Sequence, residues 1–390
     1  MFMFEKPLGM RDTLPALYKT KKAVREKITS EISGWGYDFI ETPTLEYYET
    51  VGVQSAILDQ QLFKLLDQQG KTLVLRPDMT APIARVAASR LTGSSPLRLA
   101  YQANVYRAQQ REGGRAAEFE QIGVELIGDD SISADAEAIS LMISALKASG
   151  LGNFRVAIGH IGFADALFKE ILGNQERADK LRRFLYEKNY VGYREHVKSL
   201  ALSSIDKERL LDFLTFRGDA AKMEQALSIC ESDECRQAID ELQKLWDMLE
   251  QFGAAEYVRV DLNIVSHMSY YTGILFEVYT DKTGFPLGNG GRYNRLMEKF
   301  DRPAAATGFG LQLGHLLEAL DVMEKGECKH CVIFSQERMK EAIDFAGELR
   351  GDGKQTVLQN LSGVTDVDAF TKQFEEVVYF IGSKRGEYNE

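Results

Sequence analysis

Two strand-like segments separated by a short polar loop constrain the fold of this chain more than any other feature. Residues 97–107 (LRLAYQANVYR) and 118–127 (EFEQIGVELI) have the apolar and aromatic content of strands. The intervening QQREGGRAA contains paired glycines and polar residues, which is typical of a loop. Two strands joined by a loop of this length predict an antiparallel hairpin.

Helical and strand-like patterns surround this hairpin. Residues 163–252 are rich in Leu, Glu, Lys, Arg and Ala at helical spacing, which predicts a helical insertion. Antiparallel strands with helices packed around them favour an α+β fold for residues 1–325. The other predicted helices are 17–33, 79–91 and 134–149, and the other predicted strands are 37–43, 72–75, 154–160, 256–263 and 270–280.

Two glycine-containing segments follow, and neither has the spacing of a dinucleotide loop. We predict that PLGNGGRYNRL (286–296) is a glycine-rich turn and that TGFGLQLGHLLEAL (307–320) is a strand passing into a helix. The sequence has no strand–GxGxxG–helix unit and no GxxxxGK[ST], so a Rossmann site or a P-loop is not expected. Residues 326–390 alternate strand and helix patterns as β-α-β-α-β, which predicts a small α/β domain.

Composition narrows the class of protein. The formal net charge of −11 argues against a broad nucleic-acid surface. No apolar run has the length of a membrane span, and the N-terminus lacks the pattern of a secretory signal, so we expect a cytoplasmic protein that does not bind membranes. The four cysteines are too few for a disulfide scaffold. Cys328-x-x-Cys331 alone does not complete a zinc site, so we expect reduced thiols and no metal.

The order of these segments resembles that of class II aminoacyl-tRNA synthetases. The first helix, the strand after it and Pro43 resemble motif 1, and LRPDMTAPIAR resembles the RPEGTA-type segment. YRAQQREGGRAAEFEQIGVE resembles motif 2, and TGFGLQLGHL resembles motif 3. Tyr270-Tyr271 and GNGGRYNRL match segments of the histidyl-tRNA synthetases in particular. The resemblance covers about residues 1–320 and implies an antiparallel sheet flanked by helices.

The resemblance also implies that part of the synthetase chemistry is missing. Attack of an amino-acid carboxylate on ATP develops negative charge on phosphoryl oxygens, which positioned cations stabilise. The motif 2 arginine is present as Arg107, but the two other arginine positions of the family are Ser266 and His315, and the motif 2 acid is Gln109. Losing one such donor costs roughly 10²–10³ in rate, so we expect two independent losses to abolish adenylate formation.

The amino-acid side of the same pocket is retained. Carboxylates suit the ammonium group of free histidine, and a polar group with an aromatic wall suits its imidazole. Taken singly, Glu125 is better explained as a solvated strand-edge residue, and the paired tyrosines as one core and one surface position. Arg107 and Arg115 are also candidates for binding a different anion, such as a nucleotide phosphate. The resemblance assigns histidine binding to Asp78, Thr80, Arg107, Gln121, Glu125, Tyr270 and Tyr271.

The C-terminal domain is short and acidic for a tRNA-binding domain. Residues 326–390 contain eight Lys/Arg and twelve Asp/Glu, so we do not expect tRNA binding. A synthetase-like chain that keeps the amino-acid pocket, lacks two of the arginines and has a short acidic C-terminal domain resembles the regulatory subunits of ATP phosphoribosyltransferase. These subunits are paralogues of histidyl-tRNA synthetase.

That resemblance implies a non-catalytic subunit without a cofactor. It would pair with a short-form catalytic subunit in the first step of histidine biosynthesis, form a homodimer through motif 1, and respond to L-histidine as a feedback effector. Two alternatives stay open, namely an active histidyl-tRNA synthetase and a synthetase-like module that senses uncharged tRNA.

Overall fold

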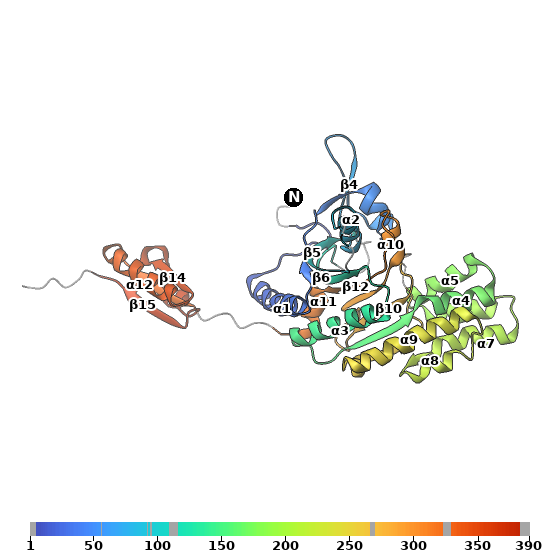
Figure 1. The fold of residues 1–390 in the computed structure, drawn as a ribbon. Helices are drawn as coiled ribbons and strands as arrows, with labels where there is room; N and C mark the ends of the chain where they lie inside the picture. The colour runs from blue at the N-terminus through green and yellow to red at the C-terminus, as the bar shows by residue number, and fades with distance from the viewer. Residues whose placement is uncertain are drawn as a thin grey trace, which may run out of the picture. The chain divides into compact units, whose positions relative to one another are not determined.

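A computed structural model describes residues 5–55, 57–91, 93, 96–108, 116–265, 270–322 and 329–382. The chain divides into two compact units, Met1–Val322 and Met323–Glu390 (Figure 1). Each unit has its own sheet and its own hydrophobic core, so each is described by itself.

The first unit combines runs of strands with runs of helices. Its helices are α1 (Pro15–Gly34), α2 (Thr80–Arg90), α3 (Ile132–Ser149), α4 (Ile161–Leu172), α5 (Gln175–Tyr186), α6 (Tyr190–Ser199), α7 (Ser204–Asp212), α8 (Ala221–Ala226), α9 (Asp233–Gln251), α10 (Asn294–Glu298) and α11 (Leu313–Leu320). Its strands are β1 (Asp38–Phe39), β2 (Leu45–Tyr47), β3 (Lys64–Leu66), β4 (Thr72–Leu75), β5 (Leu97–Tyr106), β6 (Glu118–Ile127), β7 (Arg155–His160), β8 (Arg217–Gly218), β9 (Val258–Asp261), β10 (Ile274–Tyr279), β11 (Gly288–Arg292) and β12 (Ala306–Gln312).

A large mixed sheet organises this unit. Among the described residues it has nine strands in the order β1-β5-β6-β12-β11-β10-β7-β9-β8. The strands from β5 to β7 in this order are antiparallel, whereas the β1–β5 and β7–β9 pairs are parallel. The predicted β5–β6 hairpin is therefore confirmed, and so is the α+β fold class. A small antiparallel sheet, β2-β4-β3, lies within the same unit.

The two faces of the large sheet have different chemistry, and strand β6 shows this most clearly. Ile122, Val124 and Leu126 are fully buried in the main core, to which α1, α3 and α11 also contribute. Gln121 and Glu125 alternate with these residues, so they lie on the opposite face. That second face is covered by a smaller cluster of residues that includes parts of α2 and α10. Polar side chains of β6 therefore project into the space under this second cover.

The helical insertion consists of α4 to α9 and follows β7 directly (Figure 1). Helix α9 is its longest element and packs against α3, α4 and β7. Leu242, Leu245 and Leu249 repeat at helical spacing and are completely buried. His160 at the end of β7 contacts Glu241 of α9, with 3.0 Å between Nε2 and Oε2. The insertion is thus anchored to the sheet through α9.

The glycine-rich segment 286–296 differs from the prediction of a turn. Residues 288–292 form β11 in the middle of the large sheet, and α10 follows. A Cβ at Gly290 would lie closer than 3.0 Å to the backbone of Gly308 and to the ring of Phe276. The glycines are therefore explained by close approach between neighbouring strands rather than by a turn.

The second unit has the predicted β-α-β-α-β order. Strand β13 lies between β14 and β15, and both pairings are parallel. Val332 and Phe334 of β13 pack against Ala342 and Ala346 of the first helix. The elements are β13 (His330–Phe334), α12 (Met339–Gly351), β14 (Thr356–Asn360), α13 (Val367–Thr371) and β15 (Glu376–Phe380).

Candidate functional site

One cavity in the first unit brings together all seven residues that the sequence assigned to histidine binding. Its free volume is about 30 Å³, which is small for anything larger than a water molecule. The seven residues come from the start of α2 and the segment before it, from the β5–β6 hairpin and from the segment before β10. The lining consists of Asp78, Thr80, Arg107, Gln121, Glu125, Tyr270 and Tyr271 with Tyr101, Asn289, Gly290, Tyr293, Gly308, Phe309 and Gly310.

Asp78 lies between β4 and α2 and is almost completely buried. Its Oδ1 accepts a hydrogen bond of 3.0 Å from the backbone N–H of Ala81, in the first turn of α2. Its Oδ2 is buried and has no hydrogen-bond partner among the described residues. Burial raises the pKa of Asp78, and the nearby positive charge of Arg107 opposes that change. A buried carboxylate oxygen without a partner is suited to receive a cationic ligand group.

Glu125 projects from β6 into the same cavity with 2% of its surface exposed. Tyr293 Oη donates a hydrogen bond of 2.5 Å to Glu125 Oε2. Burial raises the pKa of Glu125 to about 8, although hydrogen bonds from Tyr293 and Thr80 act in the opposite direction. Glu125 therefore changes charge near neutral pH. The possibility of a solvated strand residue is excluded by its burial.

Arg107 follows β5 and lies half-buried at the cavity. Its Nε donates a hydrogen bond of 2.8 Å to the carbonyl oxygen of Pro77, and its guanidinium lies 5.3 Å from the ring centroid of Phe119. These contacts hold the cation next to the segment that carries Asp78. Burial lowers the pKa of Arg107, and the charge of Asp78 opposes this effect.

Three tyrosines form an aromatic wall. The ring centroids of Tyr270 and Tyr271 are 5.1 Å apart, and those of Tyr270 and Tyr293 are 6.0 Å apart in an edge-on arrangement. Tyr270 and Tyr271 are both buried, at 2% and 8% exposed. The paired tyrosines therefore do not divide between core and surface, because they precede β10 instead of alternating along it.

Glycines of β12 form the floor below these side chains. A Cβ at Gly308 would lie within 3.0 Å of Glu125 Oε2, and a Cβ at Gly310 would do the same with the side-chain amide of Gln121. Gly308 pairs with Glu125 across the sheet, which explains this proximity. Because Gly308 and Gly310 have no side chains, Glu125 and Gln121 of β6 can extend over the backbone of β12.

Sequence reasoning missed Tyr293 and the charged pair beside it. Arg292 donates to Asp135 Oδ2 through Nε at 2.9 Å and Nη2 at 2.7 Å, and both side chains are buried. It also donates to the carbonyl oxygens of Asp129 and Ser131. The pair joins the end of β11 to α3 immediately before Tyr293. The available signal was the GGRYN segment, whose glycines favoured a turn.

The positions of the missing synthetase arginines are only partly visible. Ser266, together with Gln109 and Arg115, lies outside the described residues. His315 lies in α11, where its Nδ1 is 2.9 Å from the carbonyl oxygen of Pro286 and its ring stacks on Phe285. It does not line the cavity described above.

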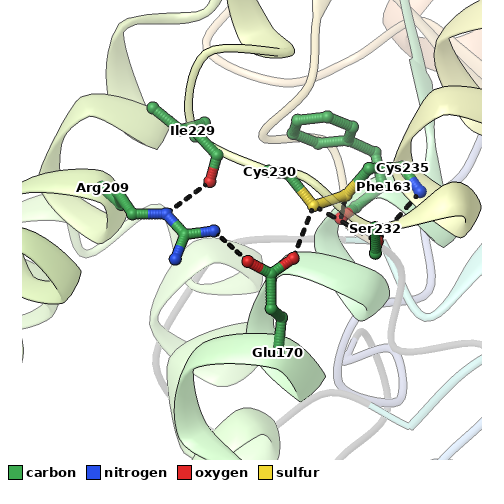
Figure 2. The surroundings of a disulfide bond; sticks show 7 residues. All are labelled: Phe163, Glu170, Arg209, Ile229, Cys230, Ser232 and Cys235. Atoms are coloured by element: carbon green, nitrogen blue, oxygen red, sulfur yellow. Dashed lines mark hydrogen bonds and ion pairs between the residues drawn. A yellow bond between two sulfur atoms is a disulfide. The ribbon is translucent and has the colours of Figure 1, made fainter.

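The cysteines differ from the expectation of reduced thiols. Cys230 and Cys235 form a disulfide in the helical insertion (Figure 2). Cys230 precedes and Cys235 follows the acidic residues at the start of α9, a pairing that the C-x-x-C interpretation did not consider. Cys331 is buried in β13, and Cys328 lies outside the described residues. Among described side chains, no cluster of three or more His, Cys, Asp or Glu could hold a metal ion. Within those same ranges no helix is long and apolar enough to cross a membrane.

Comparisons with known proteins agree on this fold. A histidyl-tRNA synthetase family model matches residues 9–316, and a model described as the C-terminal domain of the histidyl-tRNA synthetase HisZ matches residues 331–382. A histidyl-tRNA synthetase from Nostoc is similar in structure, with a TM-score of 0.78 over 95% of this chain and 88% of that one. At 18% identity this likeness shows the fold alone.

Nearer relatives carry a different name. An ATP phosphoribosyltransferase regulatory subunit from Bacillus subtilis is 63% identical over 390 residues, covering 100% of both chains. One from Geobacillus kaustophilus is 63% identical over 383 residues, covering 98% of this chain and 97% of its own length. A Bacillus halodurans structure described as an ATP phosphoribosyltransferase regulatory subunit/histidyl-tRNA synthetase has a TM-score of 0.91 at 60% identity, with coverage of 98% and 100%.

Fold and family match together define a protein of the class II histidyl-tRNA synthetase type. Its large mixed sheet flanked by helices and its helical insertion fit that class. The full-length matches at high identity then decide the group within the class. The chain belongs to the family of ATP phosphoribosyltransferase regulatory subunits.

Proposed function

We propose that this chain acts as the non-catalytic regulatory subunit of ATP phosphoribosyltransferase and that L-histidine binds in the cavity at Asp78 and Glu125. The chain would pair with a short-form catalytic subunit in the cytoplasm and enable the first step of histidine biosynthesis. One observation carries the histidine proposal, namely the presence of two buried carboxylates and a tyrosine wall in a single cavity.

The chemistry of the cavity fits a free amino acid with a basic side chain. Asp78 Oδ2 is placed to accept the α-ammonium group, because it is buried and lacks a partner within the described ranges. Arg107 is suited to the α-carboxylate, and Glu125 with the tyrosine wall is suited to an imidazole. In this assignment Arg107 binds the amino acid, and its use with Arg115 for another anion is the competing possibility.

The small size of the cavity supports regulation as well as binding. The free volume is about 30 Å³, so we expect side chains around the cavity to move when histidine enters. A ligand that binds one arrangement of these side chains better than another shifts the population toward that arrangement. The same difference in affinity would couple histidine binding to the activity of a catalytic partner.

The proposed loss of synthetase activity is supported by the substitution of two arginine positions of the family. His315 replaces a permanent cation with a ring that is held by Pro286 and Phe285, and Ser266 replaces a second one. A neutral imidazole is a poor substitute for a guanidinium group. We also propose a homodimer through the motif 1 region, and no role in tRNA binding.

Titration calorimetry with L-histidine tests the binding site. Replacing Asp78 with Asn removes a buried charge opposite the ammonium group, and we expect an affinity loss of roughly 10- to 150-fold, equivalent to about 1.5–3 kcal/mol. The exposed Asp130→Asn is the matched control and should bind histidine as the parent chain does. Unchanged affinity in a folded Asp78→Asn variant contradicts the site.

Reconstitution tests the regulatory role separately. A short-form catalytic subunit is assayed for phosphoribosyl transfer alone, with this chain, and with this chain plus histidine. We expect activity only with this chain and inhibition by histidine. Activity independent of this chain contradicts the proposal. Histidine-dependent ATP–pyrophosphate exchange by the purified chain would establish an active synthetase instead, and tight salt-sensitive tRNA binding would favour a tRNA sensor.

A further inference from the structure

The helical insertion contains a disulfide bond that lies outside the lining of the candidate histidine pocket. Cys230 lies after α8 and Cys235 lies in the first turn of α9, with their Cα atoms 6.1 Å apart (Figure 2). The two side chains are 1% and 0% exposed. Residues 231–234 connect them, and Glu231, Asp233 and Glu234 are exposed. The buried bond is therefore flanked by exposed residues at the start of α9, and a reagent would reach it through local opening of this segment.

Each sulfur also lies next to an oxygen suited to accept a thiol hydrogen. Cys230 Sγ is 3.5 Å from Glu170 Oε2, and Cys235 Sγ is 3.9 Å from the carbonyl oxygen of Phe163. A disulfide has no S–H group to donate, so these acceptors form hydrogen bonds only with the reduced pair. The surroundings therefore accommodate both redox states without leaving a buried thiol unsatisfied.

The acceptor at Cys230 is held in place independently of the sulfur. Arg209 forms an ion pair with Glu170, and its Nε donates a hydrogen bond of 2.7 Å to the carbonyl oxygen of Ile229 (Figure 2). Ser232 caps α9 by accepting a hydrogen bond from the N–H of Cys235. These contacts do not need the S–S bond, so the fold of this corner can survive its reduction.

We propose that Cys230 and Cys235 form a reversible redox switch that links the first turn of α9 to the segment that follows α8. In reduction, a thiolate of an external dithiol attacks one sulfur and breaks the S–S bond, and the second thiol of the dithiol then displaces the protein sulfur. The net transfer of two electrons and two protons gives two protein thiols and an oxidised dithiol. A low-molecular-weight disulfide reverses the reaction and is itself reduced to two thiols.

The disulfide closes the loop of residues 230–235 and so restricts the junction between α8 and α9. Without the bond, the segment between α8 and α9 gains conformational freedom, while the cap at Ser232 and the packing of α9 on α3 and α4 remain. Reduction is therefore expected to loosen one corner of the insertion and not to unfold it.

Thiol counting tests the bond. The full chain, treated with oxidised glutathione, is denatured and alkylated with iodoacetamide, and its intact mass is measured. With four cysteines in the chain, we expect two alkyl groups before and four after dithiothreitol treatment. Replacing Cys331 with Ser removes one group from both counts and serves as the control. Four alkyl groups on the oxidised chain, or glutathione mapped to Cys230 or Cys235, overturns the proposal.

Hydrogen exchange tests the switch. We expect dithiothreitol to lower amide protection in 221–240 on the order of tenfold or more, with the exchange of β5 and β6 unchanged. The Cys230→Ser/Cys235→Ser variant should match the reduced parent and ignore dithiothreitol. Cys331→Ser should respond as the parent does. If the double variant fails to fold, the comparison of the parent chain with and without dithiothreitol still tests the proposal. Equal amide protection in the two states contradicts the redox switch.

Discussion

Replacing Gly310 with Ala tests whether the floor of the cavity determines ligand binding. The added Cβ would lie closer than 3.0 Å to the amide of Gln121 and 2.8 Å from Tyr101 Oη. Both are ends of side chains, so the protein relieves the clash by moving them instead of moving the backbone. With a free volume of only about 30 Å³, a displaced Gln121 enters the space that a ligand needs.

The size of the effect follows from the cost of overpacking. An extra methyl group in a closely packed site typically costs about 1–3 kcal/mol. Because the clash is relieved toward the cavity, we expect most of this cost in histidine binding, as an affinity loss of roughly 5- to 150-fold. The thermal midpoint should change little, since Gly→Ala also lowers the entropy of the unfolded chain.

Two other glycines separate this explanation from a general effect of alanine. Gly314 lies inside α11, and a methyl group added there would have nothing within 4 Å, so Gly314→Ala should stabilise the fold by about 0.5–1 kcal/mol and leave affinity unchanged. At Gly308 the Cβ would also meet the backbone oxygen of Val124, so Gly308→Ala should lower stability as well as binding. Calorimetry and thermal unfolding measure both quantities. Parental histidine affinity in a folded Gly310→Ala variant refutes the reasoning.

Three further predictions concern buried polar groups. Asp135→Asn leaves Arg292 without its buried partner and should lower the free energy of unfolding by about 3–5 kcal/mol in urea titrations; a loss below about 1 kcal/mol contradicts this. The pKa of Glu125 is raised to about 8 by burial, so the folded state binds more protons and stability should fall as pH rises from about 5 to 8; Glu125→Gln should flatten that slope. Tyr293→Phe removes a hydrogen bond that lowers this pKa, so the slope should extend to higher pH.

The sequence predicted those strands and helices in which apolar and polar residues repeat with the period of the element, because this pattern indicates which face is buried. Strand β6 alternates apolar and polar residues, and β12 passes into α11 with apolar residues at helical spacing, so both were recognisable in the sequence. Strand β11 was not, because GNGGR has no apolar side chain to carry an alternation. Its place in the sheet depends on contacts with Gly308 and Phe276, which are distant in sequence.

The candidate site was predictable only through resemblance. Asp78, Glu125 and Tyr271 come from three separate segments, and no periodicity relates them to one another. The family order of motifs brought them together, and the structure places them around one cavity. That they bind histidine remains a prediction. The hydrogen bond between Tyr293 and Glu125 was inaccessible, because it depends on how β11 and β6 are arranged around β12.

His315 provides a final test of why this fold is expected to lack synthetase activity. Its Nδ1 lies 2.9 Å from the carbonyl oxygen of Pro286, and its ring stacks on Phe285, so the position now joins α11 to the segment before β11. His315→Arg replaces these contacts with a cation but leaves Ser266 unchanged. Because each missing donor accounts for roughly 10²–10³ in rate, the single variant should still show no ATP–pyrophosphate exchange above background. The variant should also lose about 1–2 kcal/mol of stability from the lost hydrogen bond and ring contact. Exchange restored by His315→Arg alone contradicts a double loss, whereas exchange that appears only when Ser266→Arg is added supports it.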